Sequence, residues 1–142
     1  MNLDLEERLV REGIRHDRLT KAEKVKLLAR WSRTFPELLA SARRGEVFEN
    51  VPRDKAAQDH YAGLPTCDFY VLPDDASGMP SCACFAAHPP NLSELVSDTI
   101  TKCDELVVVD SSFRWSAVFV NQGASLVGIH FSRQETSTHP DL

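Results

Sequence analysis

The sequence predicts an α+β fold in a single domain, with N-terminal helices packed on a roughly five-stranded, mainly antiparallel sheet that has one inserted helix. Two observations lead to this prediction. Helical periodicity and capping signals are concentrated in residues 1–45, whereas β-rich runs separated by turn-forming residues occupy residues 66–132. A chain of 142 residues suits one domain, 1–142, and no stretch has the composition of an interdomain linker.

Three helices are expected before the sheet. The first starts at Asn2 or Asp4 and ends near residue 11. The second covers about residues 21–34, because Thr20 and Glu23 have the spacing of a capping box. A short third helix over about 37–43 follows a proline that interrupts the helical pattern.

A hairpin and a further helix are expected next. The two strands of the hairpin cover about 67–72 and 81–87, and a loop rich in turn-forming residues joins them. The polar stretch 47–63, which precedes the hairpin, has no assignment. A helix over about 92–101 then returns the chain to the sheet. Its buried side is expected to contain Leu92, Leu95, Val96 and Ile100.

Residues 105–131 predict a three-stranded antiparallel meander. Leu106–Val109 is apolar on both faces of the pleat, which favours a central strand buried on both sides. Asp110, Ser111 and Ser112 are typical of a turn. Alternation in the second strand puts four residues on one face, namely Phe113, Trp115, Ala117 and Phe119. In the last strand the more exposed face is expected to hold Leu126, Gly128, His130 and Ser132.

The segment Phe113-x-Trp115-Ser116-x-Val118 follows a Val-Val-Asp strand. It resembles the tails of a small, functionally uncharacterised bacterial family, in which an aspartate precedes Phe-x-Trp-Thr-x-Val. The resemblance covers the final third to half of the chain and implies an α+β fold and a bacterial origin. The family continues with a Thr-His-Glu-like tripeptide where this chain has Val120-Asn121-Gln122. The resemblance implies no chemistry.

Charge is unevenly distributed along the chain. The net charge is −5, made up of +2 from residues 1–59 and −7 from residues 60–142. An acidic C-terminal half disfavours nucleic acid and attracts a basic protein surface, although acidity can also serve solubility alone. The lysines and arginines of the second helix fit a solvated face, because no groove-reading motif accompanies them. No apolar run is long enough to cross a membrane, and the acidic start lacks a signal peptide, so a cytoplasmic protein is expected.

Motifs for chemistry give little support to an enzyme. The four cysteines do not have the paired spacing of a zinc site, and buried core thiols are the favoured interpretation. The serines after Asp110 lack a nucleophile elbow and are explained by a turn. The expectation is therefore no catalytic residue, no metal and no cofactor.

The favoured hypothesis is an immunity or antitoxin protein that neutralises a cognate basic toxin by occluding it. The residues expected to bind that partner are the carboxylates and the exposed methionine Asp74, Asp75, Met79, Asp104 and Glu105. One alternative is a regulatory interaction module that pairs through an edge strand. Another is a small ligand-binding or enzymatic domain with one pocket lined by Trp31, Phe35, Tyr70, Trp115 and Phe119. The sequence does not predict the oligomeric state.

Overall fold

The computed structural model describes residues 5–43, 49–52, 64–74, 78–88, 95–96, 99–121, 123 and 126–133. The helices with described bounds are α1 (Leu5–Arg11), α2 (Lys21–Thr34), α3 (Pro36–Arg43) and the short 3₁₀ helix η4 (Ile100–Lys102). The strands are β1 (Arg15–Arg18), β2 (Glu49–Pro52), β3 (Cys67–Pro73), β4 (Cys82–Ala87), β5 (Glu105–Asp110), β6 (Trp115–Asn121) and β7 (Leu126–Arg133). No helix in these ranges is both long enough and apolar enough to cross a membrane.

The described strands form one sheet in the order β1-β4-β3-β5-β6-β7-β2, and every neighbouring pair is antiparallel. The α+β class is confirmed, and β5 lies at the centre of the sheet as predicted. The described part of the chain has seven strands where about five were predicted. The two additional strands, β1 and β2, are four-residue edge strands whose sequences, Arg-His-Asp-Arg and Glu-Asn-Val-Pro, show no apolar alternation.

A local signal explains why α2 begins where predicted. The hydroxyl of Thr20 accepts the amide of Glu23 at 3.1 Å, and the Glu23 carboxylate accepts the amide of Thr20 at 2.8 Å. This capping box satisfies two amides at the start of the helix. Helix α1 ends at Arg11 as predicted, whereas its predicted starting residues, Asn2 and Asp4, lie outside the described residues.

The inserted helix is described only in part. Leu95, Val96 and Ile100 are fully buried, as predicted, and the chain leaves this segment through η4. The predicted buried residue Leu92 lies outside the described residues.

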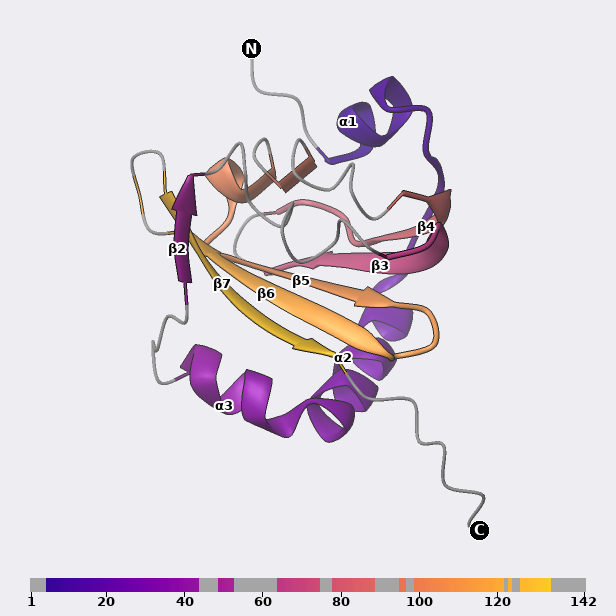
Figure 1. The fold of residues 1–142 in the computed structure, drawn as a ribbon. Helices are drawn as coiled ribbons and strands as arrows, with labels where there is room; N and C mark the ends of the chain where they lie inside the picture. The colour runs from indigo at the N-terminus through magenta and orange to yellow at the C-terminus, as the bar shows by residue number, and fades with distance from the viewer. Residues whose placement is uncertain are drawn as a thin grey trace, which may run out of the picture.

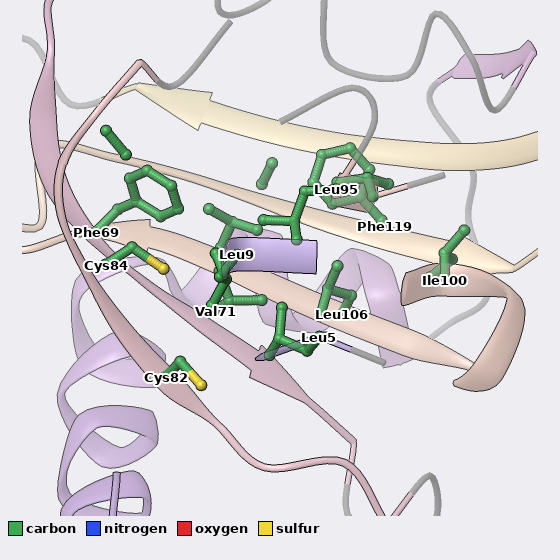
Figure 2. Packing of buried hydrophobic residues seen from close by; sticks show 14 of the residues in the cluster. Leu5, Leu9, Phe69, Val71, Cys82, Cys84, Leu95, Ile100, Leu106 and Phe119 are labelled. Carbon is green, nitrogen blue, oxygen red and sulfur yellow. The ribbon is translucent and has the colours of Figure 1, made fainter. Parts of the chain in front are cut away.

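Helices cover both faces of the sheet (Figure 1). The α1-side core holds residues from α1, the inserted segment and the sheet, and Figure 2 shows them converging. Its largest members include Leu5, Leu9, Phe69, Leu95, Ile100, Leu106 and Phe119. The α2-side core lies on the other face and comprises Trp31, Phe35, Leu38, Leu72, Val107, Val109, Phe113 and Val118. Residues of β5 alternate between the two cores, so the central strand is buried on both sides as predicted.

Phe113 does not share a face with Trp115, contrary to the prediction. Strand β6 begins at Trp115, and Phe113 lies in the preceding turn with a φ of 56°. A left-handed residue breaks the alternation that the prediction assumed, and the Phe113 ring therefore packs in the α2-side core. In the last strand Gly128 is buried rather than exposed, and the side chains of Leu126, His130 and Ser132 are outside the described ones.

Candidate functional site

Three of the predicted partner-binding residues meet at one end of the sheet. Asp74 directly follows β3, whereas Asp104 precedes β5 and Glu105 begins it. Because β3 and β5 are antiparallel neighbours, the end of one lies beside the start of the other. The amide of Asp74 donates to the carbonyl oxygen of Glu105 at 3.0 Å. We call Asp74, Asp104 and Glu105 the acidic ledge.

Strand β6 holds the ledge in position. The amide of Asn121 donates to the carbonyl oxygen of Asp104 at 3.0 Å. The Asn121 side-chain amide donates to the carbonyl oxygens of Ile100 and Cys103 at 3.1 and 3.4 Å. The Asn121 side chain thus joins the end of β6 to the segment that leads into β5. Together with the bond from the Asn121 amide, it holds the backbone at Asp104, whose side chain is exposed.

The ledge concentrates negative charge. Burial raises the pKa of the Asp74 carboxyl above its ordinary value, and the charge of Asp104 raises it further. Hydrogen bonding to the backbone of Asp104 and the nearby ammonium of Lys24 act in the opposite direction. The thiol of Cys103 reports the same field: burial raises its pKa to about 12, with Asp74 and Asp104 as the next causes. An added cation would relieve this repulsion.

Helix α2 completes the site. The ammonium of Lys24 donates to the carbonyl oxygen of Pro73 at 2.8 Å, which ties the helix to the end of β3. Between the two lies a cleft of about 210 Å³, which we call the ledge cleft. Its lining comprises Lys24, Leu28, Leu72, Pro73, Asp74, Glu105 and Val107. The helical pattern places Lys24 among solvated cations, and only the tertiary contact with β3 brings it into the site.

The other two residues predicted to bind a partner are Met79 and Asp75, and neither is an exposed contact residue in the described part of the chain. Met79 is partly buried and packs against the α1-side core, so the prediction of an exposed methionine is wrong. A flexible thioether suits such an irregular gap at the border of a core. Asp75 lies outside the described residues.

The single aromatic pocket of the ligand-binding alternative is not formed. Trp31, Phe35 and Tyr70 pack on the α2 side of the sheet, whereas Trp115 and Phe119 pack on the opposite side. The sheet itself separates the two groups, and so these five rings do not line one cavity.

The edge strand β1 offers little for self-association. It presents four charged or titratable side chains in succession, Arg15, His16, Asp17 and Arg18. At the other edge β2 ends in Pro52, which has no amide hydrogen to donate. Both features disfavour pairing of an edge strand with a second chain.

The cysteines are free thiols on or near one face of the sheet. Cys82 and Cys84 are buried in the α1-side core, and Cys103 is buried there as well, whereas Cys67 is half-buried (Figure 2 labels the first two). Burial raises the pKa values of Cys67, Cys84 and Cys103, which opposes thiolate formation. Within the described ranges no group of three or more His, Cys, Asp or Glu side chains is placed to hold a metal ion.

Comparison with known proteins adds no relative: no protein-family model, no curated protein and no solved structure matches this chain.

Proposed function

We propose that this chain is a small protein-binding protein of the immunity or antitoxin kind, which neutralises a cognate basic toxin by covering it. The observation that supports this proposal best is the acidic ledge beside an apolar cleft. The ledge carries three carboxylates. Lys24 is the cation among the residues that line the ledge cleft.

The ledge cleft suits a long basic side chain from a partner. Lysine and arginine lay their methylene groups on apolar surface while the charged end stays in a polar environment. Here Leu28 and Leu72 supply apolar wall, and Asp74 and Glu105 supply carboxylates at its border. Burial and the charge of Asp104 raise the pKa of Asp74, so a partner's cation placed here would favour the ionised form of this carboxyl and gain from its charge.

The long-range field acts in the same direction. Residues 60–142, which include the whole ledge, carry a net charge of −7. Such a field accelerates encounter with a basic surface and orients it, and its effect falls with ionic strength. Occlusion of a toxin needs fast association and a firm contact, and it needs no catalytic group.

The partner to test first is the product of the gene adjacent to the one encoding this chain. The test variant combines Asp104→Asn with Glu105→Gln, and the matched control is Glu37→Gln, which removes an exposed carboxylate from α3. We expect the double variant to associate about tenfold more slowly at low salt, with the gap narrowing as salt rises. The control should associate like the wild type.

Rescue of growth distinguishes a toxin partner from any other basic protein. Co-expression of the wild-type chain should restore growth of cells that produce the toxin, and the double variant should restore it less well. Binding without rescue would favour a regulatory module that uses the same ledge. The absence of any complex would remove the proposal.

A further inference from the structure

A second and larger hollow lies along the other flank of α2. It has a volume of about 370 Å³ and lies between α2 and strands β1, β4 and β3. We call it the α2 groove. Helical geometry explains why α2 lines both hollows. Leu28 faces the ledge cleft, whereas the preceding residue, Leu27, points in a different direction and faces the groove. Of the residues that the sequence suggested for a ligand pocket, only Tyr70 lines this groove.

The floor of the groove is a row built by strand register. Asp17 of β1 is opposite Ala83 of β4, and Ala83 is opposite Tyr70 of β3. All three line the groove, together with Phe85 two residues further along β4. Side chains opposite one another on paired strands share a face, so a small alanine lies between two larger residues. The result is a hollow with aromatic rings on its floor.

One ring of the floor already carries a cation. The guanidinium carbon of Arg15 lies 5.0 Å from the centre of the Phe85 ring. A comparable contact lies nearby, where the guanidinium carbon of Arg30 is 4.0 Å from the ring centre of Phe113, which itself packs 6.4 Å from Tyr70. Phe85 thus makes a cation–π contact directly, and Tyr70 adjoins one through Phe113. An occupant would therefore meet aromatic walls that are already positioned.

The rim of the groove has four charged residues, and two of them are engaged elsewhere. The carboxylate of Glu23 accepts the amide of Thr20 at 2.8 Å in the helix cap. The guanidinium of Arg18 is hydrogen-bonded to the carboxylate of Glu6 on α1. These two groups already have partners, which leaves Asp17 and Lys26 as the charges available to an occupant.

Asp17 and Lys26 carry opposite charges on different walls. Asp17 belongs to β1 and Lys26 to α2, and both are exposed. Within the described part of the chain, neither side chain makes a hydrogen bond or a salt bridge, although the charge of Lys26 helps to lower the pKa of the Glu23 carboxyl. An occupant bearing one charge would satisfy one wall only. An occupant bearing both charges would satisfy both while its apolar body covers the rings.

We propose that the α2 groove binds a small zwitterion with an aromatic body, of the class of free aromatic amino acids. Its ammonium group faces Asp17, its carboxylate faces Lys26, and its ring lies over Tyr70 and Phe85. The volume of the groove falls within the range of small-molecule sites, which are mostly apolar with a few placed polar groups. This site is separate from the acidic ledge and does not depend on the proposed function.

Four probes that share a phenylethyl body test the charge requirement: L-phenylalanine, phenethylamine, 3-phenylpropionate and N-acetyl-phenylalaninamide. They carry both charges, the cation alone, the anion alone and no charge. Titrations followed by NMR at the rings of Tyr70 and Phe85 should show the tightest binding for L-phenylalanine. Each single-charge probe should bind about fivefold more weakly, the effect expected of an exposed ion pair.

Two variants assign the charges to their walls. In Asp17→Asn, L-phenylalanine should bind no more tightly than 3-phenylpropionate, which lacks the ammonium group. In Lys26→Gln, it should bind no more tightly than phenethylamine, which lacks the carboxylate. The control Lys21→Gln removes an exposed ammonium from α2 outside the groove and should change neither. Equal binding of all four probes, or no shift at either ring, would overturn the proposal. Tighter binding of the blocked amide would also overturn it, in favour of a segment of a protein chain.

Discussion

The indole nitrogen of Trp31 donates a hydrogen bond to the hydroxyl oxygen of Ser116 at 2.8 Å. The same hydroxyl donates to the carbonyl oxygen of Val108 at 2.8 Å. Trp31 is 3% exposed and Ser116 fully buried, so this chain of two hydrogen bonds runs through the α2-side core. It joins α2 to the adjacent strands β6 and β5. Since the ledge cleft and the α2 groove lie on the two flanks of that helix, the contact also helps to set the shape of both.

Replacement of Ser116 by alanine should destabilise the fold. The substitution leaves the buried indole donor without its acceptor, and a buried unsatisfied polar group costs about 1–3 kcal/mol. Trp31→Phe removes the donor, so the double variant should lose less than the sum of the two single losses. Urea unfolding measures all three. Ser112→Ala, an exposed serine in the nearby turn, is the control and should change stability by less than about 0.5 kcal/mol. Strictly additive losses would mean that the hydrogen bond contributes nothing.

The turn before β6 depends on one buried carboxylate. Asp110 is 5% exposed and accepts the amides of Arg114 at 2.6 Å, Trp115 at 3.0 Å and Ser112 at 3.2 Å. These three bonds hold the turn in which Phe113 has a positive φ. Hydrogen bonds to a charged group contribute about 1.5–3 kcal/mol each, so Asp110→Ala should cost at least about 3 kcal/mol. Calorimetric melting tests this, and a variant that melts like the wild type would contradict it.

The turn around Asp110 shows both what the sequence predicts and what it does not predict. Asp-Ser-Ser predicts the turn correctly, because short polar side chains commonly bond nearby amides. The left-handed conformation of Phe113 arises from that network, and it moves an aromatic ring to the opposite core. Residue alternation alone contains no information on such a change. The strong local signals, the capping box of α2 and the apolar run of β5, were by contrast sufficient to place their elements.

Sites were less predictable than elements, since they depend on strand order. The sequence suggests Asp74 and Asp104 as separate candidates, and only the pairing of β3 with β5 places them side by side. The α2 groove depends on β1, a strand of four residues without apolar alternation. A short charged edge strand carries little periodic signal, and the row that runs through Asp17 therefore became visible only in the folded chain.

The raised pKa of Asp74 predicts a pH-dependent stability. Because the folded state holds this proton more tightly than the unfolded state does, the contribution of Asp74 favours folding at low pH and diminishes as pH rises through its folded pKa. Asp74→Asn should therefore be more stable than the wild type at pH 7, and the gain should shrink toward pH 3.8, the ordinary pKa of the group. Asp104→Asn should reproduce part of the gain, since the charge of Asp104 is the second cause of the shift. Urea titrations at several pH values would show it, and a gain that grows at low pH would refute it.

Cys67 should react slowly for a thiol that is only half-buried. Burial raises its pKa to about 11, with the negative charges of Asp110 and Asp68 as further causes. Since the thiolate is the nucleophile, alkylation by iodoacetamide should accelerate about tenfold per pH unit from pH 8 to 10. In urea the rate should level off near the ordinary value of 9.0. Asp68→Asn should speed the reaction of the folded protein, and Cys67→Ser supplies the baseline for mass spectrometry. A folded-state rate that levels off near pH 9 would show that the thiol does not experience this field.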